Sequence, residues 1–237
     1  MERNKHSLIT PAVLFAVFVL YTAAVALIDV KPVGQMNSNV GMATINKALS
    51  DAIGVHMIWY DITNILGILA LLIAAFFGVV GVIQLVTRKS LLKVDRDIII
   101  LGCFYVMVIV CYVLFDHFAI NYRPVMLEDT LEASYPSSHT MLAVCVMSTA
   151  ICQLKWKMRD EHVSRIVQGV LAVLIVLTVV GRMISGVPWF TDIIGGVLLS
   201  AFLVSLYVWF VYEAGGPGRS RNTGNEKIRR QRSAKRQ

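Results

Sequence analysis

The sequence predicts an all-α integral membrane protein with six transmembrane helices and both termini on the cytoplasmic side. The chain of 237 residues is 57% hydrophobic and 16% charged, and its mean hydropathy is +0.67. Soluble domains carry about 25% charged residues, so the composition excludes an ordinary soluble protein. Crossing about 30 Å of hydrocarbon takes roughly 20 mainly apolar residues in a helix, which sets the length of the apolar runs to look for.

The chain contains six apolar runs that are candidates for membrane spans. They cover Leu8 to Ile28, Ile65 to Val86, Ile98 to Phe118, Thr140 to Leu154, Ile166 to Ile184 and Ile193 to Tyr212. The first run is too long for a cleaved signal peptide, and no small-residue cleavage site follows it. The fourth run is short, so we expect its helix to begin before His139, within SYPSSHT.

The segment between the first two runs is too polar to span a membrane. Within it, MATINKALSDAIG places Ile45, Leu49 and Ile53 on one helical face, a pattern typical of a short interfacial helix. An ordinary loop is the alternative.

The basic residues predict the orientation, because Lys and Arg near helix ends stay on the cytoplasmic side. With the N-terminus inside, 18 of the 22 Lys and Arg residues fall on inside segments, and the outside keeps Lys31, Lys47, Arg123 and Arg182. We therefore expect one membrane domain over residues 1–212 and a basic, disordered cytoplasmic tail over 213–237 that lies against anionic lipid headgroups. The net charge of +7 is then no sign of a nucleic-acid partner.

Cysteine usage gives no indication of a metal or cofactor. All four cysteines lie inside apolar runs, and no pair has metal-ligand spacing in a loop; they are Cys103, Cys111, Cys145 and Cys152. We interpret them as small buried hydrophobic residues.

Polar residues on the predicted outer side gather in two segments, 116–141 and 181–196. The first holds Asp116, His117, Arg123, Glu128, Asp129, Glu132, Ser137, Ser138 and His139, and the second holds Arg182 and Asp192. Charged groups at membrane depth are costly, so they usually face a cavity or mark function. Two arginines, a serine pair and the first amides of a helix suit a phosphate, and a histidine can protonate a leaving oxygen.

Each of these residues also has a structural interpretation. The arginines could reach lipid headgroups at the surface, while Ser137 and Asp192 could cap helices. His139 could be a structural residue at a helix start. The whole set, taken together, favours a phosphate site without a metal ion.

The ordered set resembles the type 2 phosphatidic acid phosphatase superfamily of membrane enzymes. That family carries three motifs, written K-x6-R-P, P-S-G-H and S-R-x5-H-x3-D. DHFAINYRP supplies Arg123 and Pro124, YPSSHT supplies Pro136, Ser137 and His139, and GRMISGVPWFTD supplies Arg182 and Asp192. The resemblance runs from the third predicted helix to the sixth and agrees with the six-helix layout.

The resemblance implies a two-step phosphoryl transfer. In the family, a third-motif histidine attacks phosphorus, the aspartate four residues later holds its ring, and the second-motif histidine protonates the leaving group. Carried onto this chain, Asp192 and His139 are the expected catalytic residues. The expected phosphate ligands are Arg123, Ser137, Ser138 and Arg182.

Four positions depart from the family pattern. Pro188 stands where the nucleophilic histidine is expected, and Asp116 stands where the first-motif lysine is expected. Ser138 replaces a glycine but still offers an amide and a hydroxyl, and Gly181 replaces a serine. Proline has no nucleophilic side chain, although a proline just before a helix costs little.

Three explanations of Pro188 remain open at this point. In the first, the chain is an inactivated copy. In the second, another group attacks, and the candidates are His117, Asp192 and a water activated by His139. In the third, the protein binds lipid phosphate without cleaving it. The expected substrate is a phosphatidic acid-like lipid or an undecaprenyl pyrophosphate-like lipid, met at the outer face of the plasma membrane. A transporter is a weaker alternative, because Asp61 and Asn64 near the second run are not the mid-membrane polar groups that transporters use.

Overall fold

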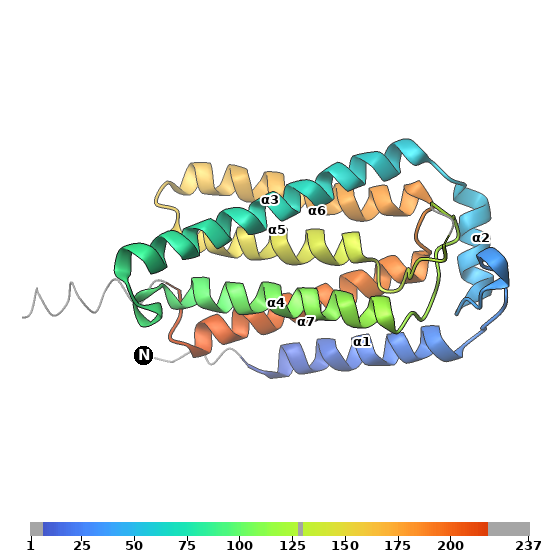
Figure 1. The fold of residues 1–237 in the computed structure, drawn as a ribbon, viewed down its shortest axis with the longest axis horizontal. Coiled ribbons are helices and arrows are strands. Elements are labelled where there is room, and N and C mark those ends of the chain that lie inside the picture. Colours follow the sequence, from blue (N-terminus) through green and yellow to red (C-terminus); the bar gives the residue numbers. More distant parts are fainter. Residues whose placement is uncertain (1–6, 128–129, 218–237) are drawn as a thin grey trace, which may run out of the picture.

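The computed structural model describes residues 7–127 and 130–217, and these fold into a bundle of long helices with one short helix across its end (Figure 1). The long helices are α1 (Ile9–Leu27), α3 (Met57–Arg88), α4 (Arg96–His117), α5 (Ser138–Lys157), α6 (Glu161–Ser185) and α7 (Phe190–Glu213). The short helix is α2 (Ala43–Ile53), and two 3-10 turns are η1 (Gln35–Asn37) and η2 (Leu91–Lys93). The expected tail lies almost wholly outside these residues.

Five of the described helices are long and apolar enough to cross a membrane, which makes the protein an integral membrane protein. The helix expected as a sixth span, α5, does not meet the same measure of length and composition. It is the central helix of the bundle (Figure 1) and packs against α3, α6 and α7. Because α5 faces protein rather than lipid, it can carry polar residues such as Thr149 and Gln153, both of which are buried.

The hydrophobic core lies between α4, α5 and α7. Its buried members include Leu101 and Phe104 from α4, Met141 from α5, and Leu203 and Tyr207 from α7. The contact of Phe104 with Tyr207 is aromatic, with ring centroids 5.3 Å apart. This core fixes α5 and α7, whose N-terminal ends lie at the expected site.

The second long helix begins earlier than the sequence indicated, at Met57 rather than Ile65. Its added turns contain the polar residues Asp61, Thr63 and Asn64, so the uninterrupted apolar run begins only at Ile65. Thr63 is fully buried, and its hydroxyl donates to the carbonyl oxygens of Trp59 and Tyr60 at 2.9 Å each. Polar side chains are tolerated there because their hydrogen bonds are satisfied within the protein.

The short helix expected between the first two apolar runs is confirmed as α2. It lies across the end of the bundle (Figure 1) and is attached to the start of α7 through Asn46. The Asn46 side-chain amide donates to Thr191 Oγ1 at 2.8 Å, and its carbonyl oxygen accepts from the Thr191 backbone amide at 3.2 Å. Ile45 on its outer face is exposed.

Basic residues gather at the opposite end of the bundle. Lys157 at the end of α5 pairs with Asp95 at 3.2 Å and with Asp97 at 2.8 Å, and Arg88 pairs with Asp95 at 2.8 Å. Partial burial of Asp95 acts to raise its pKa, but hydrogen bonds from Arg88 and Lys157 outweigh that effect, so the pKa lies below its ordinary value. These ion pairs tie the end of α3 and the start of α4 to the end of α5.

Candidate phosphate-binding site

A small pocket at the α2 end of the bundle is lined by the residues expected to bind phosphate. Its walls are Arg123, Ala133, Ser134, Ser137, Ser138, His139, Arg182, Val187 and Pro188. All the expected site residues except Asp192 therefore lie together. They come from the loop before α5, the first turn of α5, the last turn of α6 and the connection to α7.

The pocket is narrow. It holds about 10 Å³ for the centre of a water molecule, which is about the space that one water needs. A phosphate group therefore needs side chains at the pocket wall to move apart when it enters.

The start of α5 presents amide groups to the pocket. Ser137 is the N-cap residue of α5, but its side chain makes no capping hydrogen bond, so side-chain capping does not explain the serine at this position. The Ser137 backbone amide donates to the Asp192 backbone carbonyl at 2.8 Å. The amides that follow in the first turn have no carbonyl partner within the helix and point toward the helix end. Such an end carries positive potential that favours an anion.

Two glycines of α7 allow the loop before α5 to approach closely. A Cβ on Gly195 would lie 2.5 Å from the Tyr135 ring, and one on Gly196 would lie 2.9 Å from the Ser137 carbonyl oxygen. Larger residues at these positions would push the serine pair away from α7.

Arg182 is buried at 2% exposure, so it does not extend to the surface and lipid headgroups. Its Nη2 donates to Asn64 Oδ1 at 2.9 Å, and its guanidinium lies 5.0 Å from the centroid of the Tyr60 ring. Its Nε has no hydrogen-bond partner among residues 7–127 and 130–217. A buried donor without a partner is costly, so this guanidinium is suited to receive an anion.

Arg123 lies at the boundary between the pocket and a larger cavity. Its guanidinium pairs with Glu132 at 2.6 Å through Nη1, and its backbone amide donates to the Glu132 carbonyl at 3.0 Å. A guanidinium has five N–H donors in a planar fork, so the ion pair leaves donors for a second anion.

His139 packs against a glycine of α3. A Cβ at Gly67 would lie 3.3 Å from His139 Cδ2, so only a glycine leaves the imidazole its full space. The imidazole makes no hydrogen bond with the part of the chain that the structure describes, and His139 lines the phosphate pocket.

Asp192 lies behind the pocket wall and is fully buried. Its carboxylate accepts hydrogen bonds from Asn121 Nδ2 at 2.9 Å, from Ser134 Oγ and from the Trp189 amide at 3.1 Å. The bond from Trp189 caps α7, and Asn121 in turn accepts from the Gly41 amide at 2.9 Å. Asp192 thus joins α7, the loop before α5 and the loop before α2.

Several contributing residues were not singled out from the sequence for this site. Tyr60, Asn64 and Gly67 follow one another at spacings of four and three, which places them on one face of α3. That spacing was the available signal, but the polar start of α3 was not assigned to the helix. Nothing in the motifs pointed to Asn121 or Ser134.

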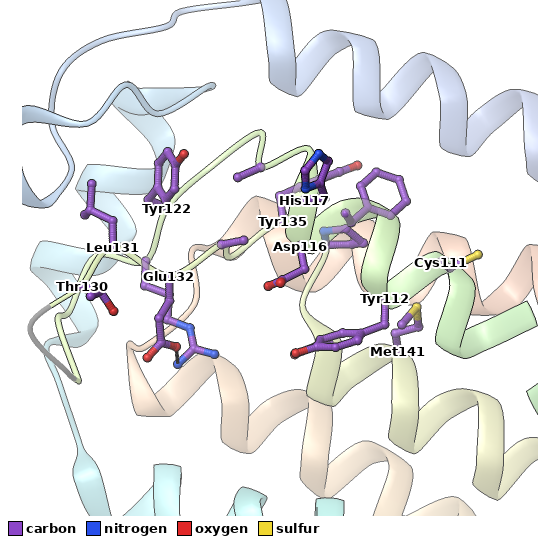
Figure 2. A pocket seen from close by; sticks show the side chains of 16 residues that line it. Cys111, Tyr112, Asp116, His117, Tyr122, Thr130, Leu131, Glu132, Tyr135 and Met141 are labelled. Carbon is purple, nitrogen blue, oxygen red and sulfur yellow. Dashed lines mark ion pairs between the residues drawn. The ribbon is translucent and has the colours of Figure 1, made fainter. Parts of the chain in front are cut away.

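The departures from the family pattern have distinct positions. Gly181 is explained by packing, because a Cβ there would lie 2.7 Å from Thr63 Cγ2 and clash with α3. Pro188 lines the pocket itself. Asp116 and His117 line a neighbouring cavity of about 510 Å³ (Figure 2), which shares Arg123 and Ser138 with the phosphate pocket. Arg182 does not line this cavity.

The fold and the pocket define a helical integral membrane protein with a polar site at one end of its bundle. The sequence profile of the PAP2 superfamily matches residues 70–215, and the chain belongs to this family. A solved structure with a similar fold is the first transmembrane PAP2 type phosphatidylglycerolphosphate phosphatase from Bacillus subtilis. It is 20% identical, with a TM-score of 0.62, and the match covers 86% of this chain and 96% of that one. No curated protein matches the chain.

Proposed function

We propose that the protein is a phosphatase that acts on a lipid phosphate or pyrophosphate at the outer face of the plasma membrane, without a metal ion. The observation that carries this proposal is the shared pocket of Arg123, Ser137, Ser138, His139 and Arg182 in a chain that belongs to the PAP2 superfamily. The five residues offer two guanidinium groups, two hydroxyls and an imidazole to one small volume.

The proposed topology has six spans with both termini in the cytoplasm. Arg88 and Lys157 are the last residues of α3 and α5, and the phosphate pocket is lined from the first turn of α5 and the last turn of α6. In Figure 1 these two sets of helix ends lie at opposite ends of the bundle, the second beside α2. Lys and Arg near helix ends favour the cytoplasmic side, so the pocket faces outward. There it meets headgroups, while the acyl or prenyl chain of the substrate stays in the bilayer.

The chemistry follows from which groups reach the pocket. Neither candidate side-chain nucleophile lines the phosphate pocket: His117 lies in the neighbouring cavity, and Asp192 is buried behind the pocket wall. Water therefore attacks phosphorus, the bond from phosphorus to the leaving oxygen breaks, and His139 passes the proton of the water to that oxygen. Arg123 and Arg182 stabilise the charge on the phosphoryl oxygens.

A second candidate function is lipid phosphate binding without hydrolysis. The observation that favours it is Pro188, which occupies the pocket wall at the family's nucleophile position and brings no attacking group. The two candidates share the binding site and differ only in turnover.

The test measures both binding and release of phosphate from phosphatidic acid in lipid nanodiscs. Arg182→Met is expected to weaken binding, and His139→Ala to abolish release while leaving binding nearly intact. The matched controls are Arg165→Met and His162→Ala, exposed residues at the basic end of α6. Binding that is unchanged by Arg182→Met would refute the proposed site.

A further inference from the structure

The cavity next to the phosphate pocket is large enough for part of a substrate. It has a volume of about 510 Å³ and lies between the end of α4, the loop before α5 and the first turn of α5. This volume is within the usual range for ligand sites, about 300 to 1,000 Å³. Because the cavity shares Arg123, Ala133 and Ser138 with the phosphate pocket, a group attached to a bound phosphate extends into it.

The walls of this cavity carry two carboxylates. Figure 2 shows Glu132 on the loop side, and Asp116 with Tyr112 on the α4 side. Glu132 is paired with Arg123 at 2.6 Å. The side chain of Asp116 makes no hydrogen bond or ion pair with residues 7–127 and 130–217, so its negative charge is the one that remains for a ligand.

We propose that this cavity receives the leaving group of the substrate, and that Asp116 selects leaving groups that carry an ammonium group over those that carry a second phosphate. The proposal rests on the proposed function, since it assumes a phosphate bound at Arg123 and Arg182. A carboxylate forms charge-assisted hydrogen bonds with an ammonium group, whereas it repels a second phosphate. Asp116 thereby acts as a specificity-determining residue.

The experiment compares three lipids with wild-type protein in nanodiscs. The probes are a long-chain 2-amino-alkyl phosphate, its N-acetyl derivative and a prenyl pyrophosphate, and the readout is the dissociation constant of each. Wild-type protein is expected to bind the amine about tenfold more tightly than the N-acetyl derivative, the scale of one hydrogen bond to a charged group. It is expected to bind the pyrophosphate most weakly.

Variants at position 116 separate charge from shape. Asp116→Asn is expected to remove the preference for the amine, and Asp116→Lys to shift the preference toward the pyrophosphate. Asp51→Asn is the control, because it removes one exposed carboxylate on α2 outside the cavity wall; it is expected to keep the wild-type order. Asp116 is exposed at the end of α4, so these changes leave the bundle core intact.

Failure of the role of Asp116 and failure of the proposed function give different results. Equal binding of the amine and its N-acetyl derivative, or a preference that persists in Asp116→Asn, overturns the role of Asp116 while the proposed function stands. Absence of binding to all three lipids overturns the proposed function, and the role of Asp116 with it.

Discussion

Replacement of Asp192 by alanine tests the network behind the pocket. The Asp192 carboxylate is fully buried and accepts from Asn121 Nδ2, Ser134 Oγ and the Trp189 amide. Asp192→Ala removes both carboxylate oxygens and with them all three hydrogen bonds. We expect a large loss of stability from this single change.

The structure sets the size of that loss. A buried donor left without a partner costs about 1–3 kcal/mol, and three donors are affected. The serine hydroxyl can rotate to another acceptor, and the variant no longer buries a charge, so the total falls short of a simple sum. The two donors that cannot turn away, the Asn121 amide and the Trp189 backbone amide, give about 2–6 kcal/mol, and we expect a value of about 3–5 kcal/mol. At about 2–4 °C per kcal/mol for a chain of this size, the midpoint of thermal unfolding falls by about 10 °C.

Thermal unfolding in detergent measures this effect, with Asp192→Asn as the conservative variant. The asparagine keeps one carbonyl oxygen but directs an amide toward Asn121, so we expect about half the loss. Asp51→Ala, at an exposed residue of α2, is the control and leaves the midpoint unchanged. A fall of less than about 2 °C for Asp192→Ala would refute the account of this network, since that corresponds to less than about 1 kcal/mol.

Three further predictions concern packing, pH and metal dependence. Gly195→Ala places a Cβ 2.5 Å from the Tyr135 ring, and we expect it to lower stability by about 1–3 kcal/mol through overpacking. Gly169→Ala is the control, because no atom lies within 4 Å of its new Cβ, and it is expected to leave stability unchanged. Thermal unfolding measures both. Because the pKa of Asp95 in the folded protein is below its ordinary value, its contribution to stability is present above about pH 4 and is lost as the pH falls through the folded pKa. The difference in unfolding midpoint between wild type and Asp95→Asn is therefore expected to disappear at low pH. A difference that persists there would contradict the lowered pKa of Asp95. Phosphate release is expected to be unchanged by EDTA, and loss of release that added Mg²⁺ restores would contradict a metal-independent reaction.

The sequence predicted the helices well where apolar length alone defines them. The first expected run, Leu8 to Ile28, and α1, Ile9–Leu27, differ by one residue at each end. The start of α3 was placed eight residues too late, because the turns before Ile65 hold polar residues, among them Tyr60 and Asn64, which contact Arg182. Polar residues inside a helix that packs on protein cannot be distinguished by hydropathy from a loop.

The sequence also predicted which residues share the pocket, because motif order and spacing encode their positions on α5, α6 and the intervening loops. It did not predict the contacts that hold them. Asn121 reaches Asp192 across 71 positions of the chain, and Asn64 reaches Arg182 across 118. Such partners depend on how α3 and the loop before α5 pack in space, and no local pattern records that packing.

The central claim is that the pocket hydrolyses lipid phosphate although Pro188 replaces the expected nucleophile. The most direct measurement is the rate of phosphate release from phosphatidic acid by the unmodified protein, with Pro188→His beside it. The account predicts slow release by the unmodified protein and faster release by Pro188→His, because a histidine at this pocket-lining position adds an attacking group next to Arg182. Release by Pro188→His alone, with none from the unmodified protein, would contradict hydrolysis by water and leave lipid phosphate binding as the function.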